Sequence, residues 1–117
     1  MSGKENIIKE KSMQFALEII AFGEKLNRMQ KFVVAKQLLR SGTAIGALIH
    51  ESQFAESKVD FIHKLKIALK EANETLYWIE VCEHSSEYPS GEELKSKVVE
   101  LIKIITAIIN SLSKNIS

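Results

Sequence analysis

The residues that could carry chemistry in this sequence are three histidines, each of which lies near acidic side chains. Asp60 and His63 are three positions apart, which is the spacing of one Glu-x-x-His pair in a di-metal helical bundle. Such a site needs a second pair and further inward carboxylates, whereas His50 and His84 lie near glutamates without that spacing. We therefore expect no metal and no other cofactor. A di-metal bundle enzyme stays as an alternative that depends on the Asp60 and His63 pair alone.

The single cysteine and the glycine-rich segment offer no better case for catalysis. Cys82 falls on the apolar side of its segment together with Ile79, and a cysteine buried in this way behaves as a small hydrophobic residue. Gly42 and Gly46 follow no strand pattern and belong to no Gly-x-x-x-x-Gly-Lys motif, so they do not form a phosphate-binding loop. The sequence therefore predicts a protein that is not an enzyme and has no small-molecule substrate.

Gly42 and Gly46 are instead predicted to bring two helices close together. They are four positions apart in a helical pattern, so they share one face that is nearly free of side chains. A glycine inside a helix costs about 1 kcal/mol of stability relative to alanine. Close packing of a neighbouring helix is the simplest reason for two glycines at these positions.

Basic residues gather in two places although the overall charge is nearly balanced. The 16 basic and 15 acidic residues give a formal net charge of +1, so nucleic-acid binding would depend on a local patch. One set lies between positions 25 and 40, and the other shares a face of the third predicted helix. The candidate nucleic-acid contacts are Lys25, Arg28, Lys31, Lys36, Arg40, Lys66 and Lys70. The alternative is that both sets are ordinary solvated surface.

Hydrophobic residues recur at steps of three and four along most of the chain, which is the pattern of amphipathic helices. The pattern predicts four of them: residues 6–28, a second from the turn near 27–31 to about 53, a third from 57 to a loop at 85–91, and a fourth to about 112. Ser57 and Ser90 each begin a capping signature at a helix start. We therefore predict an all-α, antiparallel up-down four-helix bundle that forms a single domain over residues 1–117.

The fourth predicted helix has more apolar residues than one buried stripe requires. Val99 and Ile104 lie outside the arc of about 120° that its other apolar side chains occupy. Together with the aromatic residues Tyr77 and Trp78, they are candidates for a contact between subunits. The alternative is scattered apolar residues on an ordinary surface. The sequence thus supports homo-oligomerisation as a hypothesis.

The sequence shows no pattern of secretion or membrane insertion. A single cysteine cannot form an internal disulfide, and the first residues lack the continuous apolar run of a signal peptide. The apolar stretch at residues 98–109 contains Glu100 and Lys103 and is shorter than the roughly 20 residues of a membrane span. We expect a cytoplasmic protein without a membrane partner.

Two segments of the sequence resemble a known family. Residues 37–47 (Gln-Leu-Leu-Arg-Ser-Gly-Thr-Ala-Ile-Gly-Ala) and residues 57–72 (Ser-Lys-Val-Asp-Phe-Ile-His-Lys-Leu-Lys-Ile-Ala-Leu-Lys-Glu-Ala) are similar to two blocks of the bacterial four-helix-bundle family named for 23S rRNA-intervening-sequence proteins. The resemblance implies an up-down bundle that assembles into a ring, typically a homopentamer. The family is similar to accessory proteins of diversity-generating retroelements, whose basic surface is thought to engage nucleic acid. No enzymatic activity is implied.

This sequence departs from the family pattern on the second predicted helix. Family members usually have serine and asparagine where this chain has Ala44 and Leu48. If that polar pair forms a buried hydrogen bond, its replacement by two apolar residues changes stability little. If it binds a ligand, the contact is lost here. The charged candidates that the chain retains are Arg40, Glu51, Asp60, Lys66, Lys70 and Glu71. Arg40 and the acids could equally form ion pairs between helices.

The leading hypothesis is a non-enzymatic, ring-forming bundle that acts as a structural or adaptor module and binds RNA or DNA through basic surfaces repeated around the ring. The alternative is a protein-interaction scaffold without affinity for nucleic acid, in which Tyr77 and Trp78 dock a partner helix or another subunit. The near-zero net charge favours this alternative.

Overall fold

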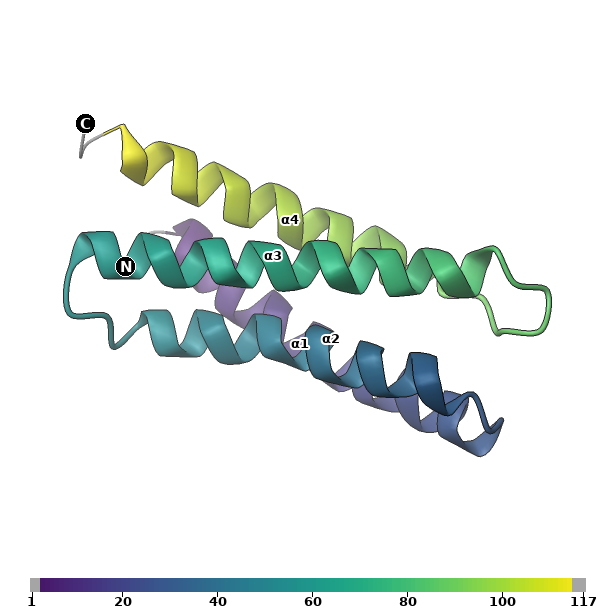
Figure 1. Cartoon of the computed structure of the whole chain (residues 1–117). Helices are drawn as coiled ribbons and strands as arrows, with labels where there is room; N and C mark the ends of the chain where they lie inside the picture. Colours follow the sequence, from purple (N-terminus) through teal and green to yellow (C-terminus); the bar gives the residue numbers. More distant parts are fainter. Residues whose placement is uncertain (1–2, 115–117) are drawn as a thin grey trace.

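The computed structural model describes residues 3–114, which form four α-helices and no strand within that range. The helices are α1 (Gly3–Arg28), α2 (Phe32–Ser52), α3 (Lys58–Glu83) and α4 (Glu92–Ser113). Helix α2 packs against α1 and α3, and α4 packs against α3 and α1, whereas the diagonal pairs make no close backbone contact in the described part of the chain. The predicted all-α, up-down bundle is therefore confirmed, with dimensions of 47 × 22 × 21 Å (Figure 1).

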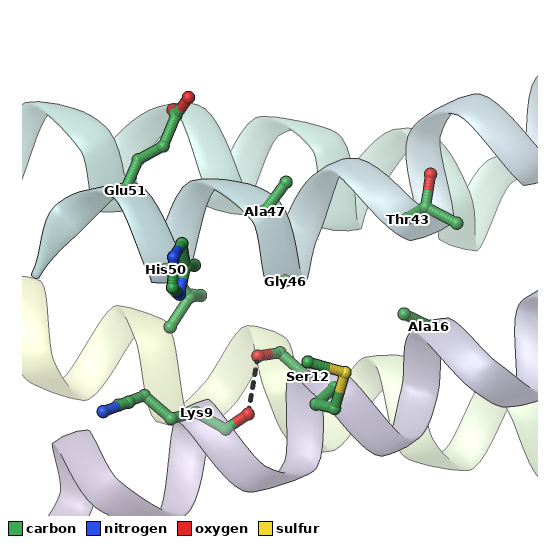
Figure 2. Close-up of a pocket in the computed structure, with 10 residues that line it drawn as sticks. Lys9, Ser12, Ala16, Thr43, Gly46, Ala47, His50 and Glu51 are labelled. Atoms are coloured by element: carbon green, nitrogen blue, oxygen red, sulfur yellow. Dashed lines mark hydrogen bonds between the residues drawn. The ribbon is translucent and has the colours of Figure 1, made fainter.

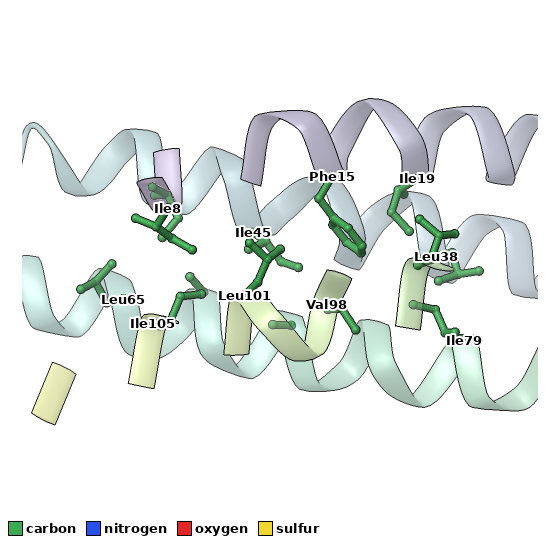
Figure 3. Packing of buried hydrophobic residues seen from close by; sticks show 14 of the residues in the cluster. Ile8, Phe15, Ile19, Leu38, Ile45, Leu65, Ile79, Val98, Leu101 and Ile105 are labelled. Carbon is green, nitrogen blue, oxygen red and sulfur yellow. The ribbon is translucent and has the colours of Figure 1, made fainter. Parts of the chain in front are cut away.

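One continuous hydrophobic core runs along the axis of the bundle and receives side chains from all four helices. Phe15 of α1, Leu38 and Ile45 of α2, Ile79 of α3 and Leu101 of α4 are among its largest fully buried members (Figure 3). Residues at steps of three, four or seven return to the same side of a helix, so each helix contributes one apolar stripe. The periodicity of the sequence therefore predicted which side of each helix is buried.

The core side of α3 is lined at its centre by small residues rather than by leucines. Ala68 and Thr75 are fully buried, while Leu69 and Leu76 are half-buried and pack at the edge of the core. Small side chains at the centre allow neighbouring helices to approach closely, and the leucines then fill the space at the periphery. This arrangement fixes the position of α3 relative to α2.

The start of α3 is capped as the sequence predicts, with one change of partner. Ser57 is the residue before the first turn, and its hydroxyl accepts a hydrogen bond of 3.0 Å from the backbone amide of Asp60. The Asp60 carboxylate accepts a bond of 3.1 Å from the amide of Glu56 instead of the amide of Ser57. Two amides at the helix start thus have acceptors.

The start of α4 differs from the prediction. Gly91, rather than Ser90, is the capping position, and no side chain of its own caps the helix. The Ser90 hydroxyl lies 3.3 Å from the amide of Glu92, only two residues on. The stronger contact comes from α3, where the Glu83 carboxylate accepts a bond of 2.7 Å from the Gly91 amide. The loop between α3 and α4 is therefore tied to the end of α3, which a local capping pattern does not predict.

The turn between α1 and α2 is short and contains a left-handed residue. Gln30 has φ of 62°, and the backbone amide of Lys31 donates a bond of 2.8 Å to the Leu26 carbonyl. A left-handed residue directly after a helix lets the chain reverse while the last carbonyls of the helix are satisfied. The turn lies within the predicted range of residues 27–31.

Helix α2 is the described helix that is long and apolar enough to cross a membrane by length and composition alone. The 18-residue window of α2 that meets this criterion has a mean hydropathy of 1.3. Its residues Leu38, Ile45 and Ile49 belong to the core of the bundle. Core helices of compact proteins pass the same test, and α2 is packed here as one of them.

Candidate functional site

The basic residues between positions 25 and 40 lie around the end of the bundle where α1 turns into α2. Lys25 and Arg28 belong to the last turn of α1, and Lys36 lies early in α2. These three residues, called the turn cations below, are exposed. None of them has an ion-pair partner within residues 3–114. They can therefore meet an anion without first breaking an internal bond.

Arg40, which the sequence placed in the same set, is engaged by α3. Its guanidinium bonds the carboxylate of Glu71 at 3.2 Å and also that of Glu74. The indole N–H of Trp78 donates a further bond of 3.3 Å to Glu74. The hydrogen bond from Arg40 lowers the pKa of the Glu74 carboxyl, and the same bond raises the pKa of the guanidinium. Arg40 thus holds α2 against α3.

Lys31 also has interaction partners within its own chain. Its ammonium lies 3.9 Å from the Glu87 carboxylate and 5.0 Å from the centre of the Tyr88 ring. Both partners belong to the loop between α3 and α4, so the contact ties that loop to the turn between α1 and α2. An ammonium held between a carboxylate and an aromatic face has less to gain from a phosphate than an unpaired one.

The second basic set, Lys66 and Lys70, is exposed on α3. Because α3 runs back toward the turn between α1 and α2, residues early in α3 lie away from that end, and Figure 1 shows this course. Lys66 is therefore separated from the turn cations along the bundle axis. The pKa of Glu74 is lowered first by the hydrogen bond from Arg40 and also by the charge of Lys70. The two predicted basic sets therefore approach each other at Arg40 and Lys70.

Three glycines line the contact between α1 and α2. A Cβ atom added to Gly42 would lie 2.7 Å from Cγ2 of Ile19, and one added to Gly46 would lie 3.1 Å from the carbonyl oxygen of Ser12. Gly23, which has no second glycine four positions away in the sequence, would place a Cβ 2.6 Å from the side chain of Leu39. Each distance is shorter than an ordinary van der Waals contact, so glycine gives these helices their close approach.

A groove opens beside Gly46 on the outer side of the same contact and is called the α1–α2 groove. It has a volume of about 550 Å³ and is lined mainly by apolar or small residues, among them Ala16 of α1 and Thr43 and Ala47 of α2. Figure 2 shows His50 extending from α2 toward α1, near Lys9, at one end of this groove. Its position was not predicted, because it depends on how closely α1 and α2 approach.

A row of exposed apolar side chains, the α1 ridge, follows the outer side of α1 next to this groove. Met13, Leu17 and Ile20 have 64%, 55% and 39% of their surface exposed. Steps of four and three place them on one side of the helix. The same spacing is visible in the sequence, but there it cannot be distinguished from the buried apolar pattern of the segment, so the sequence alone does not reveal the ridge.

The residues that were predicted as an oligomer interface do not form one exposed patch. Tyr77 is 57% exposed on α3, and its ring meets that of Trp78 edge-on at a centroid distance of 5.0 Å. Trp78 and Ile104 are half-buried against the core, and Val99 is half-buried on α4. Of the four, Tyr77 alone presents most of its side chain to solvent.

Among the described residues, the histidines and the cysteine do not come together in one site. Within residues 3–114, no three side chains of histidine, cysteine, aspartate or glutamate gather as a metal-binding group would. His63 is exposed, while the Asp60 carboxylate caps α3 as described above. Cys82 is only 1% exposed, and burial raises the pKa of its thiol to about 11. At neutral pH this thiol is protonated and poorly reactive.

The positions that depart from the family pattern lie inside α2. Ala44 and Leu48 are half-buried, and Leu48 packs against the core, so no polar group is stranded at either position. Two of the retained acids have partners within the chain, since Glu71 pairs with Arg40 and Asp60 caps α3. Glu51 is exposed beside the α1–α2 groove.

Comparison with known proteins supports the all-helical fold and identifies the family. The family model of the 23S rRNA-intervening sequence proteins matches residues 4–107. A solved structure described as a protein of unknown function from the S23 ribosomal protein family of Bacteroides thetaiotaomicron VPI-5482 shares 44% sequence identity with this chain. The alignment covers 92% of this chain and 98% of that chain, with a TM-score of 0.86. A search among curated proteins gave no match.

Both blocks that carried the resemblance, residues 37–47 and 57–72, lie inside the matched range. The match spans all four helices down to residue 107, so it includes α1 and most of α4 as well. The chain belongs to the 23S rRNA-intervening sequence protein family.

Proposed function

We propose that this protein is a non-enzymatic, homo-oligomeric adaptor of the cytoplasm that binds RNA or DNA through the end of the bundle where α1 turns into α2. The observation that carries the proposal is the set of turn cations, Lys25, Arg28 and Lys36, which are exposed and make no ion pair within residues 3–114. Unpaired cations release counterions when they bind phosphates, and this release favours association.

Three cations in each subunit are few, so repetition in an oligomer is part of the proposal. Copies related by symmetry present the same patch several times, and linked weak contacts bind a long polyanion much more tightly than one contact does. The finer form of the proposal is a closed ring, of five subunits by the family resemblance. In a ring all the turn cations lie on the same rim, because every copy has the same orientation relative to the axis.

The test compares two variants with the same change of net charge. The first reverses the turn cations (Lys25→Glu, Arg28→Glu, Lys36→Glu), and the control reverses three exposed lysines elsewhere (Lys58→Glu, Lys103→Glu, Lys114→Glu). Binding to a fluorescent single-stranded RNA is measured by anisotropy at several salt concentrations. We expect the first variant to lose binding, and the salt dependence of log K to fall by about 0.7 for each phosphate contact removed. The control should bind as the wild type does.

If both variants lost RNA affinity equally, binding would depend on net charge alone. The turn cations would then be rejected as the binding site. A third variant, Lys66→Glu with Lys70→Glu, measures the contribution of the α3 set separately. A wild-type protein that binds neither RNA nor DNA at low salt would reject the nucleic-acid proposal altogether.

A protein-interaction scaffold is the second candidate. It is favoured by the engagement of Lys31 and Arg40 with acids of their own chain, which leaves three of the five basic residues of that segment without an ion pair among the described residues 3–114. Tyr77, with 57% of its surface exposed, then offers an aromatic anchor for a partner helix. Recovery of one defined protein partner after nuclease treatment, and its loss with Tyr77→Ser, would support this function.

A further inference from the structure

We propose that Phe32, the first residue of α2, is a platform on which a base of a single-stranded nucleic acid stacks, so that this end of the bundle selects single strands over duplex. The inference rests on the proposed function, because the turn cations supply the contacts to phosphate. It adds the class of nucleic acid and an aromatic contact, neither of which the cations specify.

The first observation is the apolar surface that lies among the turn cations. Met29, Phe32 and Val33, called the apolar tip below, have 40%, 60% and 73% of their surface exposed. The core is reached from the other side of α2, where Val34 and Leu38 are buried, so the packing of the bundle leaves the tip uncovered. Burial of a phenylalanine ring is strongly favourable, and a ring left in water is therefore available to a ligand.

The second observation is that this ring has a free cation beside it. Phe32 and Lys36 are four residues apart in α2, so they are neighbours on the helix surface, with about 5–6 Å between their Cβ atoms. Both are exposed, and Lys36 has no ion-pair partner within residues 3–114. Each nucleotide carries a flat base and a charged phosphate on one sugar. An aromatic face next to a cation matches both of these parts.

An aromatic platform discriminates between single strands and duplex. In a duplex the faces of the bases are already stacked on each other, and only the backbone and the base edges are presented to a protein. In a single strand a base can turn outward and stack on an aromatic side chain. The turn cations bind the phosphates of both forms, whereas Phe32 adds affinity for the single strand alone.

The polar residues of the same turn favour nucleic acid over a lipid bilayer as the occupant. Asn27 and Gln30 are exposed, and their side-chain amides make no hydrogen bond within the described residues 3–114. Insertion of the apolar tip into hydrocarbon would take these amides out of water without partners, which is costly. Base edges carry both donors and acceptors, so they can satisfy the two amides.

The backbone of the turn holds Phe32 in place before a ligand binds. The amide of Lys31 donates a bond of 2.8 Å to the Leu26 carbonyl, and the amide of Gln30 donates one of 3.0 Å to the Asn27 carbonyl. The contact of the Lys31 side chain with the loop between α3 and α4 ties the turn down from a second direction. A ring presented in this way loses little conformational entropy on binding.

The first experiment compares two exposed phenylalanines at opposite ends of the bundle. Phe32→Ala removes the ring of the apolar tip. Phe54→Ala is the matched control, because Phe54 is 75% exposed and follows α2 at the other end (Figure 1). Anisotropy measures the affinity for a short fluorescent RNA strand and for the blunt duplex of the same sequence. We expect Phe32→Ala to bind the strand roughly tenfold more weakly and the duplex unchanged. Phe54→Ala should bind both as the wild type does.

The second experiment separates stacking from a simple apolar contact. Phe32→Trp keeps an aromatic face and should bind the strand at least as tightly as the wild type, whereas Phe32→Leu should be as weak as Phe32→Ala. With Trp78→Phe added, Phe32→Trp carries the one tryptophan of the chain, and Phe54→Trp in the same background is its control. A stacked base quenches the fluorescence of an indole ring. The single strand, but not the duplex, should therefore quench Phe32→Trp and leave Phe54→Trp unchanged.

Some outcomes would overturn the stacking contact and leave the turn cations as the binding site. One is a Phe32→Ala variant that binds the single strand as tightly as the wild type, while reversal of the turn cations still weakens binding. Another is full affinity in Phe32→Leu, which would mean an apolar contact without stacking. A third is an equal loss of strand and duplex binding in Phe32→Ala. Circular dichroism checks that each variant keeps its helices.

A wild-type protein that binds neither strand nor duplex at low salt would reject the proposed function and this inference together. If that protein floated with phosphatidylglycerol vesicles and Phe32→Ala did not, the apolar tip would be assigned to a membrane surface instead.

Discussion

Thr75 of α3 donates a hydrogen bond of 2.9 Å to the hydroxyl of Ser41 on α2, at a fully buried point of the helix contact. The Ser41 hydroxyl in turn donates to the Gln37 carbonyl at 2.9 Å. The Thr75 hydroxyl also lies 2.8 Å from the carbonyl of Glu71, so its one proton has two acceptors within reach. Buried hydroxyls with defined partners fix how α2 and α3 are aligned along their axes.

Thr75→Val should reduce the free energy of unfolding by about 1 kcal/mol, because the shape is kept while one buried hydrogen bond is lost. Ser41 keeps its bond to Gln37, so the variant leaves no stranded donor. Urea denaturation followed by circular dichroism measures the change. Thr106→Val on α4 makes the same substitution at a half-buried site and serves as the control. An equal effect in both would mean that the hydroxyl of Thr75 contributes nothing specific.

Gly42→Ala should destabilise the bundle although alanine favours helix. The new Cβ would lie 2.7 Å from Cγ2 of Ile19, and overpacking of this kind costs about 1 to 3 kcal/mol. At the upper end of its range, that overpacking cost exceeds the gain of about 1 kcal/mol that alanine brings through its higher helix propensity. Thermal unfolding should show a lower Tm. Gly3→Ala, where no atom lies within 4 Å of the added Cβ, should leave Tm unchanged or raise it.

Glu74→Gln should weaken the bundle at neutral pH and have less effect in acid. The hydrogen bond from Arg40 lowers the pKa of Glu74 in the folded state from its usual value of 4.5. A carboxyl with a lowered pKa stabilises the fold above its unfolded pKa, and this contribution is lost as the pH falls through the folded pKa. The pair is partly exposed, so the difference at pH 7 should not exceed about 1 kcal/mol. Urea midpoints at pH 7 and pH 3 measure it, and a constant difference at both would contradict the charge argument.

Cys82 should resist thiol reagents while the protein is folded. Burial leaves 1% of its surface exposed and raises the pKa of its thiol to about 11. At pH 8 a reagent therefore hardly reaches the sulfur, and only a small fraction of the thiol is ionised to the reactive thiolate. Reaction with Ellman's reagent should be slow in buffer and rapid in concentrated urea. Rapid labelling of the native protein would show that the end of α3 opens readily.

The four helices could be predicted from the sequence because their signals are local. The apolar residues of each helix repeat at the helical period, and the turn around Gln30 and the cap at Ser57 are marked by polar residues at the predicted boundaries. The start of α4 was less predictable, since the group that binds the Gly91 amide is Glu83, eight residues earlier in the preceding helix.

The surfaces could be predicted only in part, because they depend on which helices become neighbours. The sequence identified the cations at 25–40, but the pairing of Arg40 with Glu71 and of Lys31 with Glu87 depends on contacts between distant segments. The α1 ridge has the same spacing as a buried stripe. Met13, Leu17 and Ile20 can be recognised as exposed only when the opposite side of α1, with Phe15, is known to fill the core.

The contact of Lys31 with Glu87 and Tyr88 also bears on how the protein can be handled. The contact joins the two connections at one end of the bundle, whereas α1 begins and α4 ends at the opposite end (Figure 1). At 1.5 Å per residue, α1 places about 39 Å between that end and the turn cations. A surface-immobilisation tag or a fluorophore fused at either terminus therefore leaves the cationic end facing solution.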